Sequence, residues 1–248
     1  MEEENAVFKY ETRVRYEDLD ADGYVKPNAV IGFMQNTAVK HSAAAGYDVY
    51  KMAEMGIAWM VLCWDVRLGR RICWDEALIV CTWPYEFRGS IGKRCFEVRA
   101  EDGELLAQAD SWWALVRLQD QAMITVDTEM TQRFGIDGAA PFVLCRPKGR
   151  AQEVGEAFPV QRFDLDTNGH VNNGRFAEIA CAYVPEPSRI RELMIEYKHS
   201  GHLGEEIVPS YTIGEDGVYV CLSRQVDGQP YIKMRVSYVE TTEGRETI

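Results

Sequence analysis

The most informative stretch of this chain reads Asp164-Leu165-Asp166-Thr167-Asn168-Gly169-His170-Val171. An earlier stretch, Asp18-Leu19-Asp20-Ala21-Asp22-Gly23-Tyr24-Val25, matches it at five of eight positions. The three differences are Ala21 against Thr167, Asp22 against Asn168 and Tyr24 against His170. Two such octets indicate that the chain is internally duplicated, so the segments around them should also correspond.

The surroundings of the two octets do correspond. Each octet follows a strand-like segment, 8–16 or 158–163, and leads into a helical one, 27–45 or 172–183. Proline at the start of the first helix and glycine or proline after each helix fit the usual helix start and stop signals. After each helix come four strand-like segments separated by tight turns. These are 57–67, 77–88, 91–100 and 105–118 in the first half, and 192–199, 205–213, 218–225 and 231–240 in the second.

This order predicts an α+β protein in which an antiparallel sheet wraps around one central helix, twice over. A short helical stretch at 127–134 and loops with Pro and Gly separate the halves. We therefore expect an N-terminal domain at 1–135, a linker at 136–157 and a C-terminal domain at 158–248.

The bulk composition narrows the class of protein. The chain has 248 residues, of which 46% are hydrophobic, and a formal net charge of −12, which disfavours nucleic acid or an anionic membrane as the main partner. Its seven cysteines show no C-x-x-C pair, which favours free thiols over a disulfide framework or a zinc site. The acidic first residues do not resemble a secretory signal, so we expect a cytoplasmic protein. We also expect no cofactor and no metal.

The layout resembles the acyl-ACP thioesterases of plants and bacteria, which carry two tandem hot-dog domains. Four stretches carry the likeness: Met34-Gln35-Asn36-Thr37-Ala38-Val39-Lys40-His41, Ile57-Ala58-Trp59-Met60-Val61-Leu62, Ser111-Trp112-Trp113-Ala114-Leu115-Val116, and the second octet with Asn172-Asn173. The last of these is similar to the family's D-L-D-x-N-x-H-V-N-N signature. The resemblance implies that Asp166, Asn168 and His170 are catalytic.

One part of the family pattern is missing. Glu196-Tyr197-Lys198-His199 resembles the next family motif, but Ser200 and Gly201 follow it where the family commonly has Glu and Cys. The groups that can replace this Glu as the water-activating base are Asp166, Ser200 and Glu178. We favour Asp166, since a serine hydroxyl is a poor base without help.

The remaining roles follow from the resemblance and from the chemistry of acyl transfer. Thioester hydrolysis needs stabilisation of an oxyanion, and a helix N-terminus offers unpaired N–H groups, here those of Val171, Asn172 and Asn173. The first octet lacks the histidine, so we expect the first domain not to catalyse but to hold the acyl chain. Candidate lining residues are Met34, Ala38, Trp59 and Val61, although their apolar character fits ordinary core packing equally well.

The expected function is hydrolysis of fatty-acyl-ACP in fatty acid biosynthesis, with acyl carrier protein as partner and the chain a monomer or homodimer. Two alternatives stay open: an acyl-CoA thioesterase on the same fold, and an acyl-thioester-binding protein without turnover. Both octets imitate the start of an EF-hand loop, but Ala29 and Arg175 stand where its bidentate Glu belongs. Arg67, Arg70 and Arg71 can bind an acidic carrier or form an ordinary solvated surface.

Overall fold

The computed structural model describes residues 7–166 and 168–238. These residues form two compact units. Unit 1 runs up to Leu62 and includes Gly69–Leu144, whereas unit 2 comprises Cys63–Leu68 and the chain from Cys145 onward. The division after residue 144 lies within the segment expected as a linker at 136–157. Residues 63–68 fall within the N-terminal domain expected at 1–135, but in the structure they belong to the second unit.

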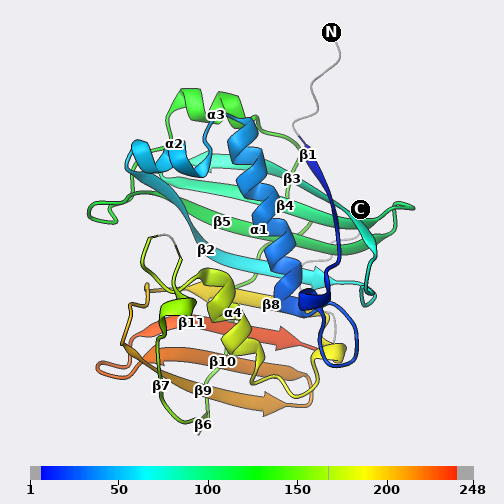
Figure 1. The fold of residues 1–248 in the computed structure, drawn as a ribbon, viewed down its shortest axis with the longest axis vertical. Helices are drawn as coiled ribbons and strands as arrows, with labels where there is room; N and C mark the ends of the chain where they lie inside the picture. Colours follow the sequence, from blue (N-terminus) through cyan, green and yellow to red (C-terminus); the bar gives the residue numbers. More distant parts are fainter. Residues whose placement is uncertain (1–6, 167, 239–248) are drawn as a thin grey trace. The chain divides into compact units, whose positions relative to one another are not determined.

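Unit 1 is an antiparallel sheet with helices (Figure 1). Its strand order is β1-β3-β4-β5-β2. Its elements are β1 (Phe8–Arg13), α1 (Pro27–Ala44), α2 (Val49–Glu54), β2 (Ile57–Leu68), β3 (Ala77–Arg88), β4 (Ile91–Ala100), β5 (Leu105–Arg117) and α3 (Thr128–Phe134). The last residues of β2 belong to unit 2.

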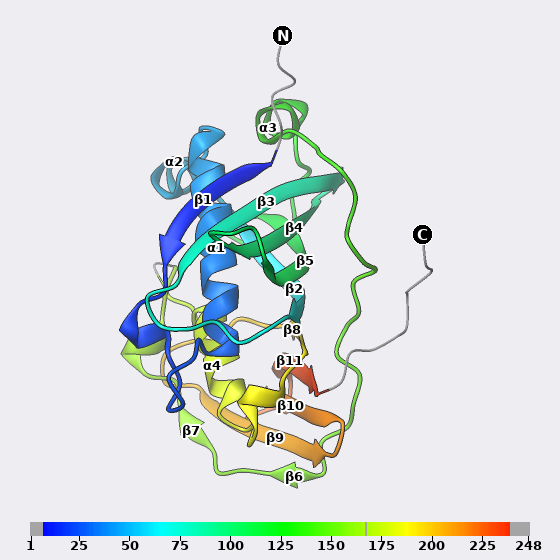
Figure 2. The same cartoon turned by 90° about the vertical axis from the view of Figure 1, so that its right-hand side faces the viewer.

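The long helix α1 explains how unit 1 forms its core. Pro27 occupies its first turn, and Gly46, with φ of +87°, follows its end in a conformation that favours glycine. Apolar residues recur along one face of α1, including Ile31 and Met34, which are 1% and 0% exposed. This face packs against β3, β1 and β4 (Figure 2).

Unit 2 repeats this plan with a shorter helix. The end of β2 pairs with β8, and the order continues β8-β11-β10-β9-β6, with β7 also on β9. The nine-residue helix α4 packs against β10 and β11. The elements of unit 2 are β6 (Glu153–Val154), β7 (Phe158–Pro159), α4 (Asn173–Cys181), β8 (Glu192–Tyr197), β9 (Glu206–Gly214), β10 (Gly217–Arg224) and β11 (Pro230–Ser237). The expected α+β arrangement of a sheet around a helix, twice, is confirmed.

Some details differ from the sequence-based expectation. The segment expected as a strand at 158–163 forms only the two-residue β7, and a 3₁₀ turn at Arg162–Asp164 follows it. Helix α2 was not expected; its N-cap Asp48 accepts hydrogen bonds from the N–H groups of Tyr50 and Lys51. The strand expected at 231–240 is described only to residue 238. In the described ranges no disulfide joins the seven cysteines, and no helix is long and apolar enough to cross a membrane.

Candidate active site

The second octet forms a closed loop just before α4. The Asp166 N–H donates to the His170 carbonyl at 2.7 Å, and the Gly169 N–H donates back to the Asp166 carbonyl at 3.1 Å. Asp166 Oδ1 accepts hydrogen bonds from the N–H groups of Asn168 (2.8 Å) and His170 (3.3 Å). Within the described residues, Oδ2 of Asp166 has no hydrogen-bonding partner. One carboxylate oxygen therefore holds the loop, and the other is available for chemistry.

The first octet forms the same loop in unit 1. The Asp20 N–H donates to the Tyr24 carbonyl at 2.7 Å, and Asp20 Oδ1 accepts from the N–H groups of Asp22 and Tyr24 at 3.0 and 3.1 Å. The first Asp of each octet also accepts a backbone hydrogen bond: Asp18 from the N–H group of Arg15, and Asp164 from that of Gln161. The carboxylates thus accept hydrogen bonds that hold the loop in both copies.

The N-terminus of α4 offers fewer free donors than expected. The Val171 N–H donates to the Gly201 carbonyl at 2.9 Å, and the Asn172 N–H donates to the Asp164 carbonyl at 2.8 Å. Asn172 is the N-cap and its side chain accepts from the Gly174 N–H. Of the three predicted donors, only the Asn173 N–H has no acceptor among the residues that the structure describes. Asn173 is therefore the backbone group best suited to an oxyanion.

The other two residues of the predicted catalytic set lie on the same loop. Asn168 is exposed, and its side chain makes no hydrogen bond to a described residue. His170 is half-buried, and its ring meets that of His202 edge to face, with centroids 4.8 Å apart. No partner of His202 could be predicted from the sequence, because the contact arises from an antiparallel bridge between residues 170 and 202.

Ser200 and Gly201 follow β8, and the Gly201 carbonyl accepts the hydrogen bond from the Val171 N–H of the octet. Ser200 is half-buried and its hydroxyl makes no hydrogen bond to a described residue. A Cβ at Gly201 would come within 3.0 Å of Phe176 Cζ and Val171 Cγ2, so the cysteine expected there does not fit without displacing them. The third candidate base, Glu178, is ion-paired with Arg175 at 2.7 Å.

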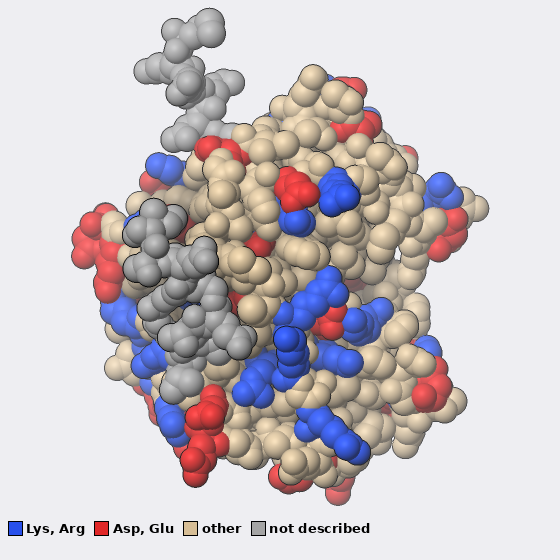
Figure 3. Space-filling view, turned by 180° about the vertical axis from the view of Figure 1, so that it is seen from behind, with Lys and Arg blue, Asp and Glu red and all other residues tan. Residues whose placement is uncertain are grey.

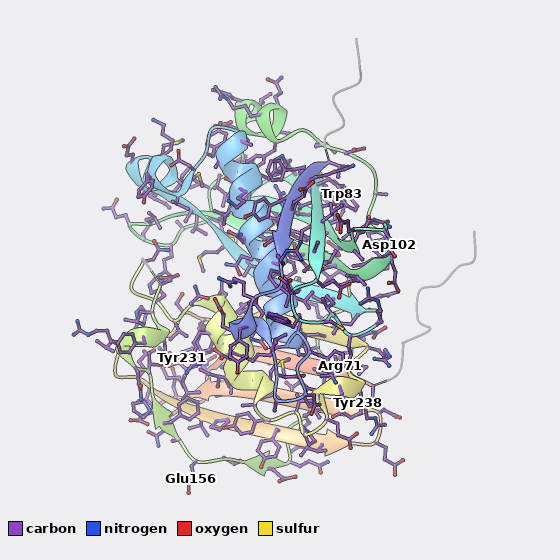
Figure 4. All side chains as sticks on the ribbon, turned by 45° about the vertical axis from the view of Figure 1, so that its right-hand side comes forward. Arg71, Trp83, Asp102, Glu156, Tyr231 and Tyr238 are labelled. Atoms are coloured by element: carbon purple, nitrogen blue, oxygen red, sulfur yellow. The ribbon has the colours of Figure 1, made fainter. Side chains whose placement is uncertain are left out.

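The corresponding positions in unit 1 carry different chemistry. Residue 72 accepts the hydrogen bond from Val25 as Gly201 does from Val171, so Arg71 corresponds to Ser200. Arg71 forms ion pairs with Asp20 and Asp22, and its guanidinium lies 4.0 Å from the centre of the Tyr24 ring (Figure 4). Pro27 corresponds to Asn173 and has no N–H to donate. Unit 1 therefore has its second carboxylate oxygen neutralised and lacks the helix donor.

The residues predicted to line an acyl pocket all belong to unit 1. Met34 and Val61 are 0% and 2% exposed, whereas Ala38 and Trp59 are half-buried. Trp59 packs beside Phe87 and Phe134, with ring centroids 6.1 and 6.4 Å away. Its buried indole N–H has no hydrogen-bonding partner among the described residues. The surroundings are therefore strongly apolar, as either a lipid pocket or a packed core requires.

Arg70 and Arg71, which the sequence suggested for carrier binding, form ion pairs within unit 1. Arg70 binds Glu76 and Glu104 at 2.5 and 2.7 Å, and Arg71 binds Asp20 and Asp22. Lys and Arg side chains gather instead on the face drawn in Figure 3. In unit 2, the half-buried Lys233 and Arg235 alternate along β11 with buried apolar residues, so they project from the side of the sheet opposite its core.

Comparison with known proteins agrees with this organisation. The family model described as the acyl-ACP thioesterase N-terminal domain matches residues 5–134, and that of the C-terminal domain matches residues 148–239. A chloroplastic acyl-[acyl-carrier-protein] hydrolase of Cuphea viscosissima is 22% identical over 95% of this chain and 63% of its own length. A chloroplastic palmitoyl-acyl carrier protein thioesterase of Gossypium hirsutum is 23% identical over 79% of this chain and 52% of its own. The chain thus spans only half to two thirds of these relatives.

Solved structures share the fold along their whole length. An acyl-ACP thioesterase from Bacteroides thetaiotaomicron superimposes with a TM-score of 0.82 at 21% identity, covering 96% of this chain and 99% of its own. A 12:0-ACP thioesterase from Umbellularia californica gives a TM-score of 0.81 at 20% identity, covering 94% and 97%. With two family domains matched in order over most of the sequence, the chain belongs to the acyl-ACP thioesterase family.

Proposed function

We propose that this protein hydrolyses fatty-acyl thioesters carried by acyl carrier protein, with the reaction centre in unit 2. The observation that carries this proposal is the contrast between the two octet loops. They share one hydrogen-bonded framework, but only the unit 2 loop combines an imidazole with a carboxylate oxygen and a helix N–H that have no partner among the described residues.

The reaction centre supplies each requirement of thioester hydrolysis. The Asn173 N–H, at the positive end of α4, stabilises the negative charge that develops on the carbonyl oxygen. Asp166 Oδ2 accepts a proton from water as the water oxygen bonds to the carbonyl carbon. The carbon–sulfur bond then breaks, and the leaving thiolate takes up the proton that Asp166 accepted, which gives free acid and carrier thiol and restores the carboxylate.

Three further side chains assist in this proposal. The Ser200 hydroxyl positions the water, because the adjacent Gly201 carbonyl bonds to the octet and the hydroxyl makes no hydrogen bond to a described residue. The exposed Asn168 amide donates to the substrate carbonyl or the water. His170 orients the substrate and shuttles a proton.

We assign unit 1 to holding the acyl chain. Met34, Ala38, Trp59 and Val61 provide the apolar surface that a fatty chain requires. The acidic carrier would bind basic side chains such as Lys233 and Arg235. A local basic surface is needed because the chain as a whole carries a formal charge of −12, which repels an acidic partner. Release of a free fatty acid from its carrier would place the protein at the end of chain elongation.

Asp166→Asn tests the proposal, because the amide oxygen can still accept the loop N–H groups while the base is lost. We expect kcat for palmitoyl-ACP and for a shorter acyl-ACP to fall about 100-fold, within the range typical of general-base loss. Free-thiol release measures the rate. The matched control is Asp20→Asn in the unit 1 loop, which should retain near wild-type turnover.

The carrier and the reaction can be judged separately. Absence of thiol release from wild type, together with tight binding of acyl-ACP, would instead indicate a binding protein. Competition by free ACP that weakens with salt supports the carrier assignment, since a basic surface binds an acidic partner less tightly at high ionic strength. Equal competition by coenzyme A would favour an acyl-CoA thioesterase.

A further inference from the structure

A second imidazole lies against His170. The rings of His170 and His202 have centroids 4.8 Å apart and planes at 79°, an edge-to-face arrangement. Residues 170 and 202 also form an antiparallel bridge, so their Cα atoms are held as cross-strand neighbours. His202 is exposed and His170 is half-buried, but the backbone bridge keeps the two residues side by side.

The backbone of His202 is held by a half-buried carboxylate, that of Glu205, which we call the clamp. Glu205 Oε2 accepts hydrogen bonds from the His202 N–H at 2.9 Å and from the hydroxyl of Tyr231, which is labelled in Figure 4, at 2.8 Å. Arg224 donates to Oε1 of the same carboxylate at 3.4 Å. Burial acts to raise the pKa of Glu205, but these hydrogen bonds and the neighbouring His202 outweigh it and hold the pKa below its usual range. The clamp is thus a carboxylate at neutral pH.

Unit 1 contains the same clamp without the imidazoles. Glu76 Oε2 accepts from the Cys73 N–H at 3.0 Å, and residue 73 forms the antiparallel bridge with Tyr24. Cys73 therefore corresponds to His202, and Tyr24 to His170. Because the clamp is common to both units, it belongs to the fold. The pair of imidazoles occurs only in the unit to which we assign catalysis.

We propose that His202 is a positioning residue for the reaction: its ring fixes the orientation of the His170 ring through the edge-to-face contact. This rests on the proposed hydrolysis in unit 2. No carboxylate at position 200 or 201 can orient His170, since these residues are Ser and Gly. Without the His202 ring, His170 would occupy its productive orientation in a smaller fraction of its conformations, and the chemical step would slow accordingly.

The test compares three substitutions of His202 in the full chain. His202→Ala should lower kcat for palmitoyl-ACP about 10-fold with KM within about 2-fold, because orientation is lost while substrate binding is kept. His202→Phe keeps a ring in the same place and should restore kcat to within about 3-fold of wild type. His202→Leu fills the volume without a ring and should stay as slow as Ala.

The control is His199→Ala, which removes an exposed imidazole bonded through Nδ1 to the Pro230 carbonyl and should not change kcat. A kcat for His202→Ala within 2-fold of wild type would overturn the proposal. So would His202→Phe remaining as slow as Ala, since the ring contact would then not be the relevant property.

A readout independent of turnover separates this proposal from the proposed function. The chain has four histidines, so their ring resonances can be resolved by NMR and that of His170 assigned with His170→Ala. His202→Ala should shift the His170 resonance, whereas His202→Phe should leave it ring-current shifted. If the His170 resonance does not move in His202→Ala, the positioning role is overturned whether or not hydrolysis occurs. If the resonance moves but the wild-type protein does not hydrolyse acyl-ACP, only the proposed function is overturned.

Discussion

Ser200→Arg should reduce kcat/KM for palmitoyl-ACP about 1,000-fold, a loss within the range for removing a general base. In unit 1 the residue at this position is Arg71, which pairs with Asp20 and Asp22. An arginine at 200 would reach Asp166 Oδ2 by the same geometry, because the two loops share their backbone hydrogen bonds. It would neutralise the proposed base and occupy the place of the water.

The steric and electrostatic parts of this effect can be separated. Ser200→Met has a similar chain length but no charge, and should lose only about 10-fold, since Asp166 then keeps its basic oxygen. Arg71→Ser makes the reverse change in unit 1 and should leave turnover unchanged. Retention of more than a tenth of wild-type kcat/KM by Ser200→Arg, with the fold intact by circular dichroism, would contradict Asp166 as the base.

The sequence predicted the strands of unit 1 well because its turns carry strong local signals. The segments expected at 77–88 and 91–100 are found with the same bounds as β3 and β4. Gly89 and Gly103, which follow these strands, have φ of +60° and +91°, conformations in which glycine is favoured. Hairpin signals of this kind depend only on neighbouring residues, so they can be read directly from the chain.

The contacts around the two octets depend on the register between distant segments, and the sequence did not reveal this register. Arg71 meets Tyr24 and His202 meets His170 because an antiparallel bridge joins each octet to the loop after a later strand. No composition or spacing encodes such a pairing. The octet itself was recognisable, but it could not show that two of the three predicted oxyanion donors already bond to Gly201 and Asp164.

A buried histidine in unit 1 should make its stability strongly dependent on pH. His41 on α1 is 7% exposed, stacks on Phe8 and lies 2.8 Å from Arg94 through its Nδ1. Burial, and then the Arg94 charge, lower the pKa of His41 from 6.5 to about 3. Burial also lowers the pKa of Arg94 to about 9, and within the described residues Arg94 forms no ion pair with a carboxylate.

The sign of the effect follows from which state binds the proton. Below pH 6.5 the unfolded chain protonates His41, whereas the folded protein keeps it neutral until about pH 3. Lowering the pH from 7.5 to 4.5 should therefore remove about 2–3 kcal/mol from the free energy of unfolding through this residue alone. His41→Gln keeps an acceptor for Arg94 but does not titrate, so its stability should fall by that much less over the same range.

Urea unfolding followed by tryptophan fluorescence measures this difference, since five of the six tryptophans belong to unit 1. Thr82→Ser is the matched control. It alters the same cluster, where Thr82 accepts a hydrogen bond from Arg94, without changing a titrating group, so its pH dependence should parallel wild type. Wild type and His41→Gln losing equal stability between pH 7.5 and 4.5 would mean that His41 is protonated in the folded protein. The buried cations of His41 and Arg94 would then lie 2.8 Å apart. No described carboxylate forms an ion pair with Arg94, so nothing in the described residues would offset the repulsion between them.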